Sequence, residues 1–321
     1  MIIGIEIGGT KLQIALGDPN GTIVKIVRGK VSLKEGNAGI LYWIKNHLDE
    51  MLSEQQTCGV QIDAIGVGFG GPLDSIAGTL LRSVQVSGWD NFNLKGWFED
   101  TFSISTYIYN DSSAAGWGEY VLGSGRGTRQ FFYTNIGSGI GGSLILENCL
   151  YDGQGVGAGE LGQVRIADWT AEKPGMDNRL EALCSGWAIE QRLRTPGYVP
   201  ENSILMQLCN GDINQFSCAM LGTAVAGRDT FALEELDRVA EGMSMALADI
   251  LCLFQPERIA IGGGVSLIGV PLFEMVRKHT EKRQFVSNKN RYDIVQCELG
   301  EAIVLQGVIL LAAKDFGKEV K

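Results

Sequence analysis

The sequence predicts an α/β protein with mixed sheets flanked by helices, built from two similar halves with a cleft between them. Strand-like runs come in hairpins at the start of each half, and helical periodicity follows later. A strand–glycine turn–strand pattern also occurs twice, as IGIEIGGTKLQIAL at 3–16 and as FYTNIGSGIGGSLIL at 132–146. This internal echo indicates a duplicated core.

The expected elements follow in order along the chain. Runs of β-branched and apolar residues bounded by turn residues predict strands, and apolar residues recurring every three to four positions predict helices. The expected strands cover residues 2–7, 11–16, 22–28, 62–67, 105–109, 131–136, 143–146 and 258–261. The expected helices cover residues 39–52, 233–254 and 301–316, with further helices beginning near 112 and 271. We expect a smaller domain of residues 1–110 with 301–321, which holds the first hairpin, and a larger domain of residues 111–300.

Composition limits the classes of function. The net charge of the 321-residue chain is −10 at pH 7, which repels nucleic acid phosphates and anionic membrane surfaces. No apolar run approaches the roughly 20 residues of a membrane span, and no basic leader precedes the first strand. Seven cysteines without a C-x-C or C-x-x-C spacing are typical of free thiols in a reducing compartment. We therefore expect a cytoplasmic protein that binds neither nucleic acid nor a membrane.

The two hairpin turns are rich in glycine, and the 44 glycines of the chain are near twice the usual share of roughly 7%. The first turn holds Gly8, Gly9, Thr10 and Lys11, and the second is Gly137-Ser138-Gly139. Glycine lets successive backbone N–H groups approach a phosphate, and the hydroxyl groups add donors. Tight hairpins alone would also favour glycine, but two such turns beside polar or acidic strand residues predict a phosphate site.

Other glycine patterns are less specific. The pattern G-x-G-x-x-G occurs at Gly137, Gly139 and Gly142. A dinucleotide site requires a helix after this pattern, whereas an extended apolar run follows here, so a dehydrogenase is disfavoured. A third glycine cluster at 262–264 ends a buried strand. It would let a nucleobase lie against the backbone, and a close strand–helix crossing would explain it equally well.

Carboxylates provide the candidate acid–base groups. Asn110 and Asp111 follow a predicted strand and precede a predicted helix. This position suits a helix cap, and it also suits a base that takes a proton from a hydroxyl nucleophile. The chain has only two histidines, and neither has an acid–nucleophile setting, so any general base is expected to be a carboxylate. Glu160, between small residues, and Glu181, near a helix start, are further candidates, although single acids are more often solvated surface residues.

In order along nearly the whole chain, seven short motifs resemble those of the ROK family of sugar kinases and sugar-responsive repressors. They are IEIGGTK, IGVGFGGPLD, YNDSSAAGWGE, NIGSGIGGSLI, GAGELGQ, RLEALCSG and IAIGGGVS. The resemblance implies two duplicated actin-like ATPase domains of ribonuclease H-like fold, and ATP-dependent phosphorylation of a sugar. Glucose is the first expected substrate, because Asn110, Asp111, Glu160 and Glu181 match the glucokinase-like set.

The resemblance also implies a role for each matching residue. Asp111 would be the general base for the attacking sugar hydroxyl, and Glu6 would bind Mg²⁺ through water, although many members have Asp there. The sugar would contact Gly71, Pro72, Asn110, Asp111, Glu160, Gln163 and Glu181. ATP would contact Gly8, Gly9, Thr10, Lys11, Gly137, Ser138, Gly139, Gly262, Gly263 and Gly264.

Two features depart from the family's pattern. Gln163 stands where the family commonly has histidine, and the segment TAEKPGMDNRLEALCSG that follows lacks a cysteine cluster, so a structural zinc is not expected. Repressor members carry an N-terminal DNA-binding domain, whereas this chain starts at the first strand. Fructose, mannose, allose and N-acylated amino sugars stay open as substrates, and a non-catalytic sugar sensor is the rival hypothesis. Because family members are often dimers, we expect a homodimer.

Overall fold

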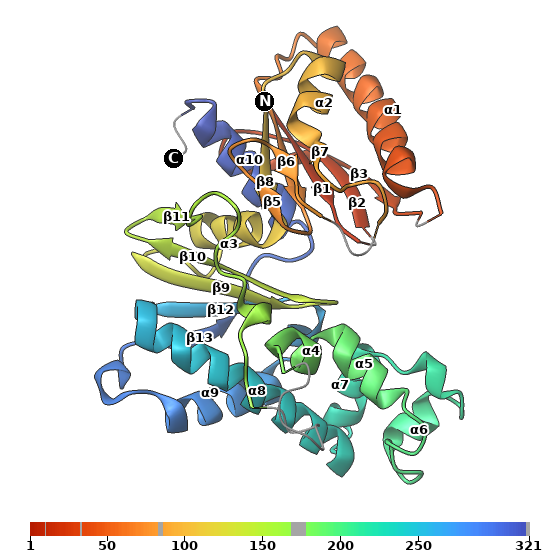
Figure 1. Ribbon diagram of the computed structural model, residues 1–321, viewed down its shortest axis with the longest axis vertical. Coiled ribbons are helices and arrows are strands. Elements are labelled where there is room, and N and C mark those ends of the chain that lie inside the picture. The colour runs from red at the N-terminus through yellow and green to blue at the C-terminus, as the bar shows by residue number, and fades with distance from the viewer. Residues whose placement is uncertain (10, 33, 83–85, 168–177, 319–321) are drawn as a thin grey trace.

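The computed structural model describes residues 1–9, 11–32, 34–82, 86–167 and 178–318, and Figure 1 shows its two tiers of sheet and helix. The upper sheet has five strands in the order β3-β2-β1-β4-β8. Strands β1 to β3 form an antiparallel meander, and β4 and β8 run parallel to β1. Their bounds are β1 Ile2–Ile7, β2 Lys11–Gly17, β3 Ile23–Lys30, β4 Ala64–Phe69 and β8 Thr106–Asn110.

The lower sheet repeats this arrangement. Its strand order is β11-β10-β9-β12-β13, again an antiparallel meander followed by two strands parallel to the first. The matching order and directions confirm the expected duplicated core. The bounds are β9 Gln130–Ile136, β10 Ile140–Leu146, β11 Cys149–Tyr151, β12 Arg258–Gly262 and β13 Asp293–Gln296. A small third sheet contains β5 Leu73–Asp74, β6 Thr79–Leu80 and β7 Phe92–Asn93.

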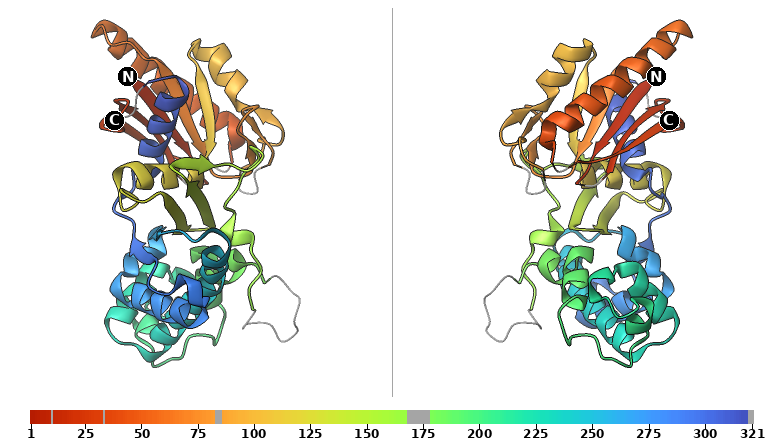
Figure 2. Two further views of the ribbon diagram at one scale, coloured as in Figure 1. Left: turned by 90° about the vertical axis from the view of Figure 1, so that its left-hand side faces the viewer. Right: turned by 90° about the vertical axis from the view of Figure 1, so that its right-hand side faces the viewer.

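Three hydrophobic cores hold these layers together. Helices α1 (Gly36–Thr57) and α2 (Leu94–Phe102) cover the outer face of the upper sheet. Helices α3 (Asp111–Leu122) and α10 (Ile303–Asp315) are packed between the two sheets, as Figures 1 and 2 show. The outer face of the lower sheet is covered by a helical layer: α4 Leu180–Cys184, α5 Gly186–Leu193, α6 Ile204–Leu208, α7 Cys218–Ala226, α8 Thr230–Phe254 and α9 Val270–Arg283.

Glycine allows α3 and α10 to cross closely between the sheets. A Cβ atom on Gly307 of α10 would lie 1.8 Å from the carbonyl oxygen of Ala114 on α3. A Cβ atom on Gly118 would in turn lie 3.0 Å from the carbonyl oxygen of Ile303. Because Gly307 has no side chain, the two helix backbones can touch at this point. This contact joins the upper and lower tiers.

A buried carboxylate fixes the segment that leads into α10. The Glu119 side chain on α3 is fully buried and accepts backbone N–H groups from Ser124 at 2.9 Å, Glu298 at 2.6 Å and Leu299 at 3.0 Å. Three donors satisfy a charge that burial would otherwise disfavour. Glu119 therefore anchors the passage of the chain from β13 back to the upper tier.

Several predicted elements have different bounds. The second hairpin strand begins at Ile140 rather than 143, because Gly141 and Gly142 pair with Asn135 and Thr134 of β9. Sequence patterns missed most of the short helices of the lower layer, since five to nine residues give too few repeats for periodicity to register. Within the described ranges, no helix is long and apolar enough to cross a membrane.

Candidate functional site

Asp111 lies where β8 ends and α3 begins. The capping role belongs to its neighbour, since the Asn110 side chain accepts the backbone N–H groups of Ser112 at 2.9 Å and Ser113 at 3.1 Å. Asp111 Oδ1 also accepts the Ser112 N–H, at 2.7 Å. Burial raises the pKa of Asp111 above its ordinary value, and the hydrogen bonds from Ser112 oppose this rise. A carboxylate of raised pKa is a stronger base.

The first glycine hairpin lies beside Asp111. Its turn is closed by a hydrogen bond from Gly8 N to Lys11 O at 3.0 Å. The carbonyl of Ile7, one residue before the turn, accepts the N–H of Gly70 at 3.1 Å. A Cβ atom on Gly70 would lie only 3.0 Å from Asp111 Oδ2, so Gly70 lies in space between the hairpin and the carboxylate. Thr10 lies outside the described residues.

Glu6 and Lys11 flank this hairpin. Burial is the main effect on Glu6, and it raises the pKa of this carboxyl group. The hydrogen bond from Gln13 Nε2 at 2.8 Å and the charge of Lys11 lower the pKa, whereas the charge of Asp111 raises it. The charge of Asp111 therefore acts on the Glu6 carboxylate. Lys11 is half exposed and lies 3.7 Å from Glu301.

The second glycine hairpin approaches the start of α3 from the other tier. Its turn is closed by Gly137 N and Gly139 O at 2.9 Å. Asn135 Oδ1, two residues before the turn, accepts the Ser112 hydroxyl at 3.3 Å and the Gly141 N–H at 3.2 Å. A line of contacts thus runs from the first hairpin through Gly70 and Asp111–Ser112 to Asn135 and the second hairpin.

The other predicted sugar-binding acids lie near the same point. The Glu160 side chain still reaches solvent, but partial desolvation raises its pKa and is the largest cause of the shift. The negative charges of Asp111 and Glu181 raise this pKa further. Glu181 Oε2 accepts the N–H of Ile140 at 2.9 Å. A Cβ atom on Gly139 would lie 2.6 Å from the same oxygen. Glu181 is therefore held against the second hairpin.

Three further predicted residues take less direct positions. Gly71 O accepts Asn110 Nδ2 at 3.4 Å, and Pro72 O accepts the N–H of Leu81 at 3.0 Å, so this segment lies next to the start of α3. Gln163 ends the 3₁₀ helix η1 (Leu161–Gln163), and its exposed side chain accepts Arg179 Nη1 at 3.2 Å.

The triple-glycine loop ends β12 beside the second hairpin. Gly262 pairs with Asn135 in the sheet. Gly263 has φ +83°, and a Cβ atom there would lie 2.6 Å from the Ile136 carbonyl, so a close backbone approach requires this glycine. A Cβ atom on Gly264, in contrast, would meet no described atom within 4 Å.

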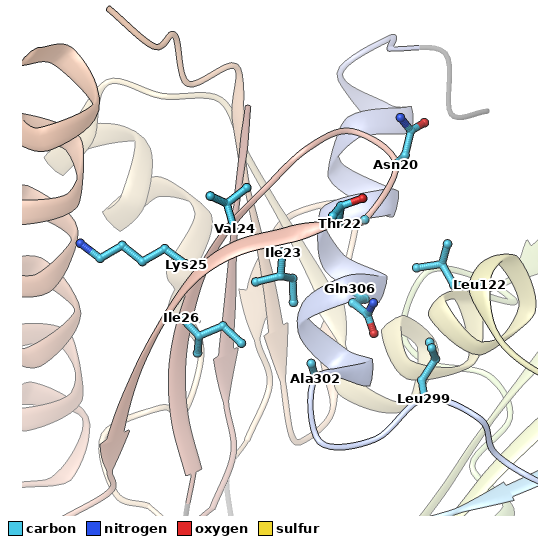
Figure 3. A pocket seen from close by; sticks show the side chains of 11 residues that line it. Asn20, Thr22, Ile23, Val24, Lys25, Ile26, Leu122, Leu299, Ala302 and Gln306 are labelled. Carbon is cyan, nitrogen blue, oxygen red and sulfur yellow. The ribbon is translucent and has the colours of Figure 1, made fainter. Parts of the chain in front are cut away.

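Two hollows differ in size and in chemistry. A wide one of about 610 Å³ lies between β3, the start of α10 and Leu122, as Figure 3 shows, and none of the predicted site residues lines it. A second one of about 10 Å³, room for a single water, is lined by Gly8, Gly9 and Gly70 with apolar neighbours. Gly70 lies against Asp111, so the smaller hollow is the one beside the candidate acid. The candidate site is therefore identified by its residues and not by the volume of the hollow.

The acids present suit magnesium better than a metal held by many protein ligands. In the described part of the chain, no group of three or more His, Cys, Asp or Glu residues is placed to hold a metal ion. Mg²⁺ keeps several waters and takes one or two carboxylates plus substrate phosphates. The partly buried Glu6 carboxylate beside the first hairpin fits that pattern. Residues 170–177, the first eight residues of the 17-residue segment at 170–186 where zinc ligands were sought, lie outside the described ranges.

Sequence reasoning missed several residues of this region. Gln13 faces Glu6 across the first hairpin, and Asn135 links the second hairpin to α3. Ser75 crosses between the tiers, because its hydroxyl donates to Asp152 Oδ2 at 2.6 Å and its N–H donates to Gly155 O at 2.8 Å. The polar residues before each glycine turn were visible in the sequence, whereas the Ser75 contact joins residues 77 apart and left no local signal.

The chain is similar to known proteins along nearly its whole length. The family model described as "ROK family" matches residues 2–315. A glucokinase of Thermotoga maritima is 28% identical over 318 residues, covering 98% of each chain. A crystal structure of a ROK family glucokinase from Streptomyces griseus, in complex with glucose and AMPPNP, matches with TM-score 0.80 and 26% identity over 98% of this chain and 99% of that one. A xylose repressor of Caldicellulosiruptor bescii is 23% identical over 98% of this chain and 78% of its own length.

Proposed function

The chain belongs to the ROK family, and from that premise we propose that it is an ATP-dependent sugar kinase. It transfers the terminal phosphoryl group of ATP to a hexose hydroxyl, with glucose as the first candidate. The observation that carries this proposal is the line of contacts that joins both glycine hairpins through Gly70 and Asp111. Phosphoryl transfer depends mostly on positioning and charge stabilisation, which such an arrangement provides.

Asp111 acts as the general base in this proposal. The sugar hydroxyl attacks the γ-phosphorus, a new O–P bond forms, the β–γ bridging bond breaks and ADP leaves. The hydroxyl proton passes to the Asp111 carboxylate, whose raised pKa makes it a better acceptor. Ser112 and Asn110 hold the start of α3, and so the position of this carboxylate.

The sugar and the nucleotide take opposite sides of Asp111. Asn110, Glu160, Glu181 and Gln163 would bind sugar hydroxyls, and Gly71 and Pro72 would shape that pocket. The two hairpins would bind the phosphates, and residues 262–264 the adenosine. Mg²⁺ at Glu6, held through water, would neutralise phosphate charge. Glucose is preferred because the Thermotoga maritima relative is a glucokinase and the Streptomyces griseus structure holds glucose.

The finer organisation is proposed on the same grounds. Residues 1–110 with 301–321 would form one domain and residues 111–300 the other, and the protein would act as a homodimer. Closure of the two domains would exclude water and limit wasteful hydrolysis of ATP.

A non-catalytic sugar sensor is the second candidate. It is favoured by one observation, the match over 98% of this chain to a xylose repressor. Both hairpins and Asp111 are present here, and a protein that only senses sugar has no need of a base at the attacking hydroxyl.

An ADP-release assay separates the two candidates. The purified protein is incubated with ATP, Mg²⁺ and, in turn, glucose, mannose, fructose, allose and N-acylated amino sugars. We expect sugar-dependent ADP release that falls about 10²- to 10⁴-fold in Asp111→Asn, with sugar binding retained in calorimetry. Sugar binding without ADP release from any sugar would support the sensor. Turnover near the wild-type rate in Asp111→Asn would remove Asp111 from the role of base.

A further inference from the structure

Trp187 is a large aromatic side chain on the open face of a short helix. It lies in the first turn of α5, and 58% of it is exposed. The other side of this helix is buried, through Gly186, Ala188 and Ile189. Packing of α5 therefore does not explain the tryptophan, whose exposed aromatic face is available to a ligand.

The backbone of Trp187 is bonded to the second glycine hairpin. Its N–H donates to Ser138 O at 3.3 Å, and the N–H of Gly186 donates to Gly137 O at 2.7 Å. The two backbones approach so closely that a Cβ atom on Gly186 would lie 2.6 Å from Gly137 O, so only glycine fits at this position. The backbone that carries the indole is thus held directly against the turn proposed to bind phosphate.

The triple-glycine loop reaches the same region from β12. It leads into the 3₁₀ helix η3 (Gly264–Ile268), which packs on α7, where a Cβ atom on Gly222 would lie 3.3 Å from Ile268 Cγ1. The first residue of α7, Cys218, donates its thiol to Gly186 O at 3.5 Å. Figure 1 shows α5 and α7 together below the lower sheet. The first turn of α5, the second hairpin and the glycine loop are therefore linked through α7.

We propose that the Trp187 indole packs against the base and ribose of a purine nucleotide whose phosphates lie at the two hairpins. This assignment rests on the proposed kinase function and adds a nucleotide contact to it. The face of an indole stacks on a base without needing a particular hydrogen-bond pattern. A Cβ atom on Gly264 would meet no described atom within 4 Å, so this part of the glycine loop is open to a ligand.

Difference fluorescence tests the contact directly. Wild type and Trp187→Phe are titrated with AMPPNP, and in a separate experiment with glucose alone. We expect AMPPNP to change the emission of wild type by an amount that is largely absent in Trp187→Phe, while glucose produces no difference between the two proteins. A Trp187-dependent signal that follows glucose and not AMPPNP would move the indole to the sugar side and overturn the proposal.

Binding and kinetics of Trp187→Ala provide a second readout. We expect the Kd for AMPPNP and the KM for ATP to rise roughly 5- to 100-fold, the range expected for loss of one stacking partner. The KM for the sugar and the melting temperature should stay unchanged, and Trp187→Phe should restore most of the affinity. Tripolyphosphate, which has the phosphates and no base, should inhibit wild type and Trp187→Ala equally. Leu253→Ala, at another exposed apolar side chain, is the matched control.

The outcomes also separate this proposal from the kinase assignment. If wild type binds AMPPNP and Trp187→Ala binds it equally well, the role of Trp187 is refuted and the kinase function stands. If wild type neither binds AMPPNP nor releases ADP with any sugar, both proposals are refuted. If Trp187→Ala weakens tripolyphosphate as much as AMPPNP, the indole supports the hairpin and does not contact the base.

Discussion

At the scale of single residues, Asp111 shows how a carboxyl group proposed to act as a base can oppose stability. Burial raises its pKa above the ordinary value of 3.8, and hydrogen bonds from Ser112 and from the backbone of Asp111 itself work against this effect. A buried carboxylate that is ionised at neutral pH lacks the water that would solvate it. The fold therefore tolerates an unfavourable charge at the position where the proposed reaction needs a base.

The pH dependence follows from the direction of the shift. The folded protein binds more protons than the unfolded chain between pH 3.8 and the higher folded pKa of Asp111. The stability that the protonated carboxyl contributes is complete below pH 3.8 and is lost as the pH rises through the folded pKa. We expect Asp111→Asn, which stays neutral, to melt at the wild-type temperature or above it at pH 7, and the difference to shrink toward pH 4.

Thermal melts at the two pH values check this prediction. Asp90→Asn, on an exposed turn, is the control for removal of one negative charge, and it should show no such pattern. A melting temperature of Asp111→Asn clearly below that of wild type at pH 7 would mean that the carboxylate stabilises the fold.

At the scale of elements, α3 connects the chemistry to the frame of the molecule. Its first residue is Asp111, its middle touches α10 at Gly118 and Gly307, and its last turn carries Glu119. The Glu119 carboxylate holds residues 298 and 299, which lead into α10. The helix that presents the proposed base is thus fixed at both ends by hydrogen bonds and along its length by backbone contact.

Glu119→Gln tests the anchoring of α10. The glutamine oxygen can still accept Ser124 and Glu298, but its NH₂ group would face the Leu299 N–H and leave that donor unpaired. We expect the free energy of unfolding to fall by about 1–3 kcal/mol, the usual cost of an unsatisfied buried group. Urea denaturation provides the measurement, with Glu147→Gln as the exposed control that should change little. A Glu119→Gln protein as stable as wild type would show that the carboxylate charge is not needed there.

At the scale of the whole molecule, the two tiers touch at more than the central helices. Ser75, in the turn between β5 and β6, donates its hydroxyl to Asp152 Oδ2 and to Gly155 O in the other tier. The chain from Asp152 leads on to Glu160, one of the proposed sugar-binding residues. This contact therefore joins the two tiers on the side of Asp111 where the sugar is proposed to bind.

Ser75→Ala tests whether this contact favours the closed arrangement. The alanine keeps the backbone bond to Gly155 and loses the hydroxyl bonds, so the melting temperature should change little. We expect the KM for the sugar to rise by about 2- to 10-fold, which corresponds to loss of one hydrogen bond, with a smaller effect on kcat. Ser53→Ala, on the exposed side of α1, is the control. A sugar KM equal to that of wild type would show that the Ser75 hydroxyl has no part in closure.

The sequence by itself determined the repeated strand–turn–strand pattern, the long helices, the family and the set of candidate acids. These features are local, because apolar spacing and glycine turns act over a few residues. Only the tertiary structure decided that Asn110 caps α3 beside Asp111, that Gln163 meets Arg179, and that the backbone of Trp187 bonds to the second hairpin. Each of these contacts depends on packing between distant segments, for which local spacing contains no information.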